Sequence, residues 1–101
     1  MVDHLFEALA DRHRRQLCIA LLENETRSEI LAPEDAHVGE TELEVFRIEM
    51  THKHLPKLVD AGFIRWDREA NEISKGPNFE EMRPFLKLMD EHSEQLPGTW
   101  P

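Results

Sequence analysis

Cysteine is nearly absent from this chain: Cys18 is the only one, and a single thiol excludes an internal disulfide bond. No apolar run approaches the roughly 18 residues of a membrane-spanning helix, and the N-terminus lacks the pattern of a signal peptide. The 101 residues are enough for one domain with a modest core. We therefore expect a cytoplasmic protein.

The features that support catalysis or metal binding are also missing. There is no Gly-rich phosphate loop, no Ser or Cys nucleophile beside a base and no placed pair of carboxylates. A metal centre needs clustered Cys or His ligands, but Cys18 stands alone on an apolar helix face, where we expect a core position. His52 and His54 are two residues apart, which places them on different sides of a helix. We expect neither an enzyme nor a metal or cofactor site.

Positive charge is scarce as well. The chain has 21 acidic and 12 basic residues, a net charge of −9, whereas nucleic-acid-binding domains are usually basic. Residues 23–49 contain nine acids and two bases, but residues 50–75 contain four acids and five bases. A Debye length of about 3 Å at molar salt makes an acidic surface tolerable, so the composition favours a halophilic cytosol. The one segment with a positive balance, 50–75, is the candidate for binding a polyanion.

Apolar residues at helical spacing predict two helices at the start of the chain, over residues 3–9 and 12–23. Asp11 can cap the second of them. Three cations occupy the first turn of that helix, an unfavourable position against its dipole: Arg12, Arg14 and Arg15. They form either a solvated face or a contact with phosphate or with acidic residues.

The middle of the chain is predicted as loop followed by a long helix. Residues 24–40 suggest a short extended piece near 27–31 and then loop, because Pro33 breaks any helix. A bent helix is predicted over residues 42–61. The bend is expected near residue 55, because Pro56 removes a backbone donor and disfavours helix in the residue before it.

A helical wheel centred on Leu55, at about 100° per residue, sorts the side chains of this long helix. One set falls on the Leu55 face: Ile48, Thr51, Leu58 and Val59. A second apolar set lies on roughly the opposite side: Leu43, Phe46 and Met50. Either one helix is buried on two faces, or two helical pieces meet near residues 50–54. On this wheel Lys53 and Lys57 point away from the Leu55 face. His54 lies on the flank of that face, and His52 is turned partly inward.

Gly62 fits the left-handed position that ends a helix, and alternation beyond it predicts a β-hairpin over residues 63–75. Asn78, followed three residues later by Glu81, resembles a capping box for a final helix. Pro84 is expected to interrupt its first turns, so that its regular part runs from there to about residue 95.

The final helix carries an apolar stripe: Phe85, Leu88, Met89, His92 and Leu96. A stripe of this kind on a terminal helix commonly packs against a second copy of the chain. The expected dimer interface is therefore formed by four residues: Phe85, Leu88, Met89 and His92. The alternative is that the helix folds back on its own core.

Two stretches resemble a known family. Leu5-Phe-Glu-Ala-Leu-Ala-Asp-Arg-His-Arg-Arg-Gln-Leu17 resembles the opening of ArsR-like winged helix-turn-helix regulators. His54-Leu-Pro-Lys-Leu-Val-Asp-Ala-Gly-Phe-Ile64 resembles the end of their recognition helix, and the Pro and the following Trp-Asp are similar to small ArsR-like proteins of haloarchaea. The resemblance implies a mainly α fold with a small β-hairpin, in which residues 1–78 form a winged helix-turn-helix and 79–101 a dimerisation helix and tail. It also implies a homodimeric transcriptional regulator that binds duplex DNA.

For such a regulator the long helix would enter the major groove. The expected DNA-binding residues are on that helix and at the hairpin tip: Lys53, His54, Lys57, His52 and Arg68. The chain departs from the family in residues 24–40, which lack the usual preceding helix, and in three acids close to where phosphates would approach: Glu42, Glu44 and Glu49. The alternative function is a degenerate winged helix that binds a protein partner through the face of Leu43, Phe46 and Met50.

Overall fold

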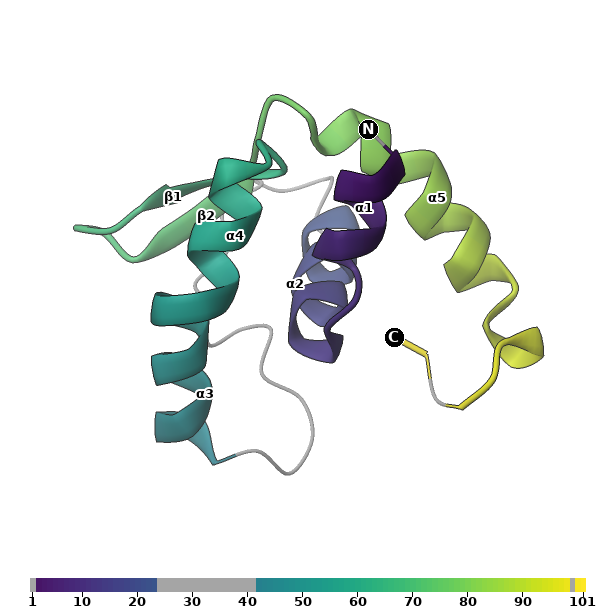
Figure 1. Ribbon diagram of the computed structural model, residues 1–101, viewed down its shortest axis with the longest axis horizontal. Helices are drawn as coiled ribbons and strands as arrows, with labels where there is room; N and C mark the ends of the chain where they lie inside the picture. Colours follow the sequence, from purple (N-terminus) through teal and green to yellow (C-terminus); the bar gives the residue numbers. More distant parts are fainter. Residues whose placement is uncertain (1, 24–41, 99) are drawn as a thin grey trace.

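The computed structural model describes residues 2–23, 42–98 and 100–101 (Figure 1). The predicted extended piece near 27–31 lies outside these residues. The described part is mainly helical with one two-stranded antiparallel sheet, which confirms the predicted α+β class. Its elements in chain order are α1 (Val2–Ala8), α2 (Arg12–Glu23), α3 (Leu43–Glu49), the π-helical turn η2 (Met50–His54), α4 (Leu55–Asp60), β1 (Ile64–Asp67), β2 (Glu72–Lys75), α5 (Phe79–Glu91) and the 3₁₀ turn η3 (Ser93–Gln95).

The first two helices form as predicted, and α1 and α2 lie between the long helix and α5 (Figure 1). Asp11 Oδ1 accepts a hydrogen bond from the His13 amide at 2.8 Å, which confirms the predicted cap of α2. Cys18 is completely buried in the core, also as predicted. No helix in the described ranges is both long and apolar enough to cross a membrane.

The arginines of the first turn of α2 have a role that neither sequence interpretation contained. The Arg14 guanidinium donates to the carbonyls of Ala8 at 2.8 Å and of Glu7 at 3.2 Å, and Arg15 donates to the carbonyl of Leu9 at 2.9 Å. These three carbonyls lie at or just beyond the C-terminal end of α1, where helical carbonyls lack their regular partners. The cations therefore stabilise the negative end of α1, which offsets their poor position at the start of α2.

The predicted long helix is present, but its middle is wound differently from an α-helix. α3, η2 and α4 follow one another without a break (Figure 1), and the Leu55 amide donates to the carbonyl of Met50, five residues back. This wider turn precedes Pro56, which has no N–H to give to the regular ladder. The second of the two predicted alternatives is therefore correct: two helical pieces meet at residues 50–54.

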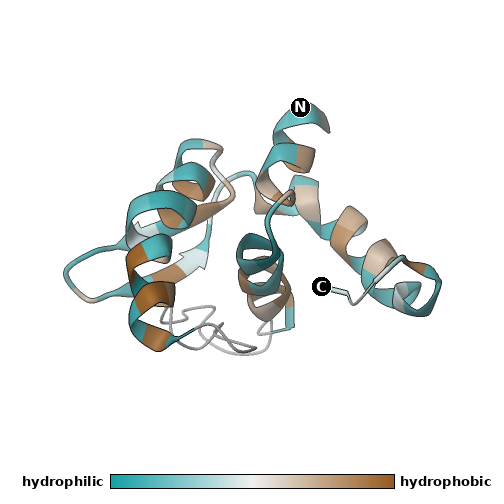
Figure 2. Cartoon of the chain, turned by 60° about the horizontal axis from the view of Figure 1, so that its bottom comes forward, coloured by the Kyte–Doolittle hydropathy of each residue, from teal (hydrophilic) through white to brown (hydrophobic). Residues whose placement is uncertain are grey.

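The π turn changes which side chains the helix buries. One extra residue in a turn rotates everything beyond it by about 100° relative to a regular helix. Four residues consequently share the buried face: Phe46, Met50, Leu55 and Leu58. The prediction that Ile48 lies on that face, with Phe46 opposite, is wrong, because it assumed an unbroken α-helical period. Val59, which follows the π turn in α4, is 38% exposed, so its predicted burial is also not observed. Ile48 is 61% exposed, and the colours of Figure 2 show that α3 contains several hydrophobic residues.

The helix ends at Gly62 as predicted. Gly62 has φ +78°, its amide donates to the Val59 carbonyl at 2.9 Å, and the Phe63 amide donates to the Leu58 carbonyl at 3.1 Å. This pair of bonds is a Schellman motif, which needs a left-handed residue at its centre. The next residues enter the hairpin at once.

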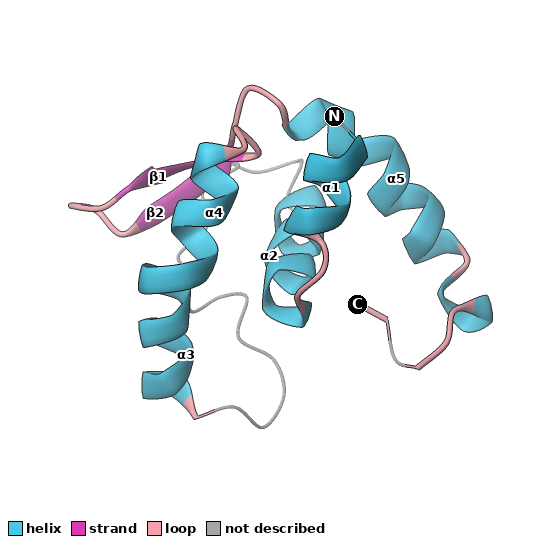
Figure 3. Cartoon of the chain, in the orientation of Figure 1, coloured by secondary structure: helices cyan, strands magenta, loops and turns pink. Residues whose placement is uncertain are grey.

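The predicted hairpin is also confirmed. β1 and β2 pair antiparallel with Ile64 opposite Lys75 and Asp67 opposite Glu72 (Figure 3). Asp67 Oδ1 accepts bonds from the amides of Glu69 and Ala70 at 3.1 and 3.2 Å, so the side chain shapes the turn.

The hairpin returns to the end of α4 through Gly76. A Cβ at this position would lie 2.5 Å from the Gly62 carbonyl oxygen and 2.7 Å from the Ile64 nitrogen, both backbone atoms. We expect Gly76→Ala to lower the free energy of unfolding by about 2–3 kcal/mol, because the two segments must move apart. Urea unfolding measures this change. Gly98→Ala is the control: a Cβ there meets nothing within 4 Å, and its only cost is the positive φ of 75°, about 1 kcal/mol. Equal costs for the two variants would contradict the close approach.

α5 begins after Asn78, but Asn78 does not cap it with its side chain, and the capping-box prediction is wrong in this respect. Asn78 Nδ2 instead donates to the Ala61 carbonyl at 3.0 Å. The predicted interruption at Pro84 is also wrong, because the helix runs from Phe79 to Glu91. Pro84 is exposed, so the carbonyl that loses its helical partner can be solvated. Phe79, Met82 and Leu86 face the core.

Candidate nucleic-acid interface

The surface of the π turn carries the first group of candidate DNA contacts. Thr51, His52 and Lys53 are consecutive and all exposed, whereas the residues on either side of them, Met50 and His54, are buried. The prediction of an outward Lys53 is therefore confirmed in position. His52 is also outward, although the helical wheel turned it partly inward. Donors of this kind can bind phosphate oxygens or the edges of bases.

The wheel placed His54 on the flank of the Leu55 face, and in the structure this flank is buried. His54 has no exposed surface, and its Nδ1 lies 2.9 Å from Nη1 of Arg14. Its Nε2 lies 3.6 Å from a carboxylate oxygen of Asp11 and 3.7 Å from one of Glu49. Because it is buried, His54 cannot contact DNA in this structure. Sequence reasoning missed its partner, Arg14, because the two residues are 40 positions apart.

Lys57 points toward α1 rather than away from the molecule. Its ammonium forms a hydrogen bond and ion pair with Glu7 Oε1. The hydrogen bond and the charge of Lys57 hold the pKa of Glu7 below its ordinary value. The expectation of a free outward cation at position 57 is therefore wrong, because α1 supplies Glu7 as a partner on this side of α4. Of the two predicted lysines, only Lys53 points away from the molecule.

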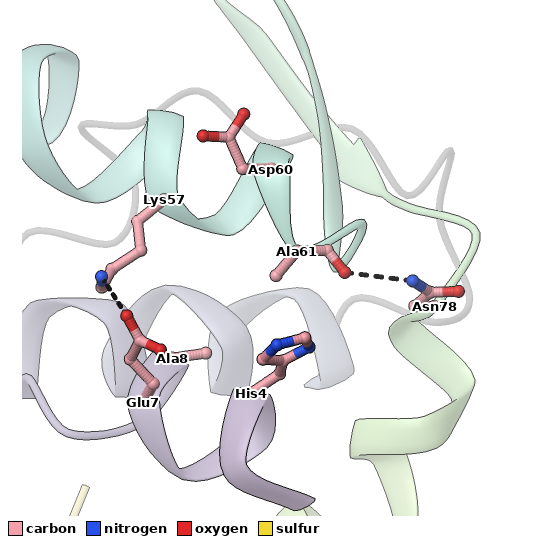
Figure 4. Close-up of a pocket in the computed structure, with 7 residues that line it drawn as sticks. All are labelled: His4, Glu7, Ala8, Lys57, Asp60, Ala61 and Asn78. Atoms are coloured by element: carbon pink, nitrogen blue, oxygen red, sulfur yellow. Dashed lines mark hydrogen bonds and ion pairs between the residues drawn. The ribbon is translucent and has the colours of Figure 1, made fainter. Parts of the chain in front are cut away.

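The Lys57–Glu7 pair closes one end of a cleft of about 660 Å³ between α1 and the end of α4. Figure 4 shows Asn78 at the other end, bonded to the Ala61 carbonyl, and His4 and Asp60 on opposite walls. The lining residues are His4, Glu7, Ala8, Lys57, Asp60, Ala61 and Asn78. The cleft has charges of both signs, and it lies beside the helix that carries the candidate DNA contacts.

The hairpin supplies the second group of candidate contacts. Arg68 is exposed at the predicted tip, and its guanidinium carbon lies 4.4 Å from the centre of the Trp66 ring. This cation–π contact holds the side chain over the strand. Arg65 is exposed on β1 and was not among the predicted contacts. The strand alternation, which places Arg65 on the face opposite to Ile64, could have identified it.

Two of the predicted dimer residues of α5, Phe85 and Met89, are partly buried, and the other two, Leu88 and His92, are exposed. Phe85 is partly buried and its ring meets Phe6 edge to face, with 5.8 Å between centroids, while Leu88 is 54% exposed. Met89 is half-buried and His92 is exposed. Phe6, which is 55% exposed, extends the apolar surface onto α1. The sequence stripe on α5 alone could not reveal this contribution from another helix.

Cys18 and the histidines form no metal site in the described ranges, where no group of three or more candidate ligands is found. Burial raises the pKa of the Cys18 thiol to about 12, which makes it an unreactive core residue.

Comparison with known families places the chain in one of them. No curated protein matches it, and neither does any solved structure. The family model described as "Domain of unknown function (DUF7344)" matches residues 6–74, which extend from α1 to the second strand of the hairpin. Since the match covers more than half of the 101 residues, this chain belongs to the DUF7344 family.

Proposed function

We propose that this protein is a winged helix-turn-helix transcriptional regulator that binds duplex DNA. The observation that carries the proposal is the exposed group of Thr51, His52 and Lys53 on a helix that passes directly into a hairpin with exposed Arg65 and Arg68. A helix can enter the major groove while a hairpin follows the neighbouring backbone. Lys53 is suited to phosphate or guanine, and His52 to a base edge or phosphate.

The charge of the chain defines how such binding must work. With a net charge of −9, long-range attraction to DNA is weak. Affinity built on many phosphate contacts also falls steeply as salt rises. A protein of this composition in molar salt would therefore depend on a few direct contacts, on shape and on the fit of a dimer.

The proposed assembly is a cytoplasmic homodimer. The apolar surface of Phe6, Phe85, Leu88 and Met89 spans α1 and α5 and remains partly open in the single chain. A two-fold axis through this surface would bury it against its own copy. It would also present two helices with their hairpins to the two half-sites of an operator.

We expect Lys53→Glu to weaken DNA binding about tenfold or more and to reduce the salt dependence of the affinity, because one contact is replaced by a repulsive charge. Fluorescence anisotropy with the upstream region of the protein's own coding sequence and with fragmented genomic DNA, from low to molar KCl, measures this. Lys87→Glu on the exposed face of α5 is the matched control, since it makes the same change in net charge elsewhere. Lys57→Glu is less informative, because it also breaks the pair with Glu7.

Equal effects of Lys53→Glu and Lys87→Glu would contradict the proposed contact surface. Absence of binding at any salt concentration by the folded protein would contradict DNA binding itself.

A second candidate function, a protein-interaction module, is favoured by one observation. The predicted face of Leu43, Phe46 and Met50 is not available, because Phe46 and Met50 are in the core. However, Leu43, Val45 and Ile48 are exposed apolar residues on the short helix α3. Under this alternative Ile48→Asp is the damaging change and Lys53→Glu has no effect on function.

A further inference from the structure

The strongest unexplained feature of the molecule is a cluster of charged and polar side chains around two buried ones, His54 and Arg14, behind the π turn. His54 is its centre, with no exposed surface. Asp11, His13 and Arg14 face it from the start of α2, and Glu49 and Lys53 flank it on its own helix. A buried histidine surrounded by both carboxylates and cations is costly to assemble unless its hydrogen bonds serve the fold or the function.

The hydrogen bonds determine where the proton of His54 is. A guanidinium can only donate, so the Arg14–His54 contact of 2.9 Å requires an unprotonated Nδ1. The proton of the neutral ring is then on Nε2. This nitrogen has no hydrogen-bond partner within the described residues, and the carboxylates of Asp11 and Glu49 stand just beyond bonding distance at 3.6 and 3.7 Å.

We propose that Arg14 and His54 are a positioning pair that holds the π turn in place, and that proton uptake by His54 releases the turn and weakens DNA binding. A proton on Nδ1 removes the acceptor of Arg14 and places two cations face to face. At the same time it strengthens the attraction of the ring for Asp11 and Glu49, so the ring and the turn that carries it move. The DNA part of this inference rests on the proposed function, whereas the coupling of the proton to the turn does not.

The π turn makes this coupling direct. Thr51, His52 and Lys53, the exposed donors, are in the same five-residue turn as His54. A turn of this type is less stable than α-helix and often occurs at functional sites. Loss of the Arg14 bond would therefore change the exposed surface of the turn without unfolding the rest of the helix.

The direction of the pH dependence follows from the surroundings of His54. Burial lowers its pKa below the ordinary value of 6.5, and Arg14, His13 and Lys53 lower it further, while the Asp11 charge opposes them. The ring is therefore neutral in the folded protein at neutral pH. Below about pH 6.5 the unfolded chain takes up the proton first, so the stability falls as the pH falls. The pKa of Asp11 is lowered from 3.8, so this carboxylate does not change its charge between pH 7.5 and 5.5.

The experiment compares the wild type with His54→Gln and with His4→Gln at pH 7.5 and 5.5. A glutamine at position 54 can accept from Arg14 and cannot take a proton, while His4 is an exposed histidine on α1, outside the proposed DNA surface. We expect the wild type and His4→Gln to lose thermal stability, amide protection at residues 50–55 and DNA affinity on acidification. One coupled proton changes the affinity by at most about tenfold per pH unit. His54→Gln should keep its affinity at pH 7.5 within about threefold and lose most of this pH dependence.

Nitrogen NMR of the wild-type imidazole provides the test that does not depend on a variant or on DNA. The expected result at pH 7.5 is the tautomer with a bare Nδ1 and a protonated Nε2. A protonated Nδ1 at that pH, or the same pH dependence of stability and protection in His54→Gln as in the wild type, overturns the positioning pair. If the wild type binds no DNA at either pH, the proposed function fails, and the NMR and protection measurements still decide the role of the pair.

Discussion

Replacing Phe46 with alanine is expected to lower the free energy of unfolding by about 3–5 kcal/mol, whereas Ile48→Ala should change it by less than about 0.5 kcal/mol. Phe46 is 1% exposed and packs edge to face on the His13 ring at 5.3 Å between centroids. Its removal leaves a cavity between α3 and the start of α2. Ile48, on the outer side of the same helix, loses little contact.

Urea unfolding followed by far-UV circular dichroism measures both variants under the same conditions. A regular α-helix through residues 42–61 predicts the opposite order, since it puts Ile48 on the Leu55 face and Phe46 away from it. A larger cost for Ile48→Ala than for Phe46→Ala would therefore contradict the π turn as well as the packing.

Arg14→Met is expected to cost about 3–5 kcal/mol of stability, although methionine has a similar length. The change leaves two buried acceptors without their donor, the carbonyl of Ala8 and Nδ1 of His54. The partly buried carbonyl of Glu7 loses one donor and keeps the amide of Ala10 at 3.3 Å. Arg12→Met is the matched control in the same turn of α2, because Arg12 is exposed. Its expected cost is below about 0.5 kcal/mol.

Thermal and urea unfolding at pH 7.5 compare these variants with Arg14→Lys. Lysine keeps the charge but replaces the fork of the guanidinium with a single ammonium, so we expect an intermediate loss. Equal stability of Arg14→Met and Arg12→Met would show that the buried hydrogen bonds contribute nothing.

The parts of the fold that were predictable from the sequence are the parts that local chemistry decides. Asp11 could be identified as a cap because its oxygen reaches an amide two residues on. Gly62 could be identified because only a residue with easy access to positive φ fits a Schellman end, and the alternation after it defines the hairpin.

The helix over residues 42–61 was predictable in extent but not in phase. A residue of its π turn, His54, contacts Arg14, a partner 40 residues away that no local pattern reveals. A single extra residue in one turn was enough to exchange the positions expected for Ile48 and Phe46. The burial of His54 and the pairing of Lys57 had another cause: Arg14 and Glu7, which contact them, come from α2 and α1.

The candidate site was therefore only partly predictable. Lys53 and Arg68 are exposed as expected. Lys53 lies within the π turn, and Arg68 lies at the tip of the hairpin. Arg65 was missed because its exposure depends on which face of the hairpin is buried. Phe6 was missed because its role depends on which helix packs beside α5. The interruption expected at Pro84 did not occur, because proline removes one donor but does not prevent helical backbone on either side.

The junction at Asn78 has a consequence for the proposed dimer. Its side-chain amide donates a hydrogen bond to the Ala61 carbonyl, and its backbone amide donates one to the Gly62 carbonyl at 2.8 Å. The start of α5 is therefore bonded directly to the end of the long helix. No flexible linker separates α5, the proposed dimerisation helix, from the long helix of α3, η2 and α4, which is the proposed reading helix for DNA. The distance between the two reading helices of a dimer would then be fixed by rigid backbone, and the dimer would accept only a narrow range of spacings between operator half-sites.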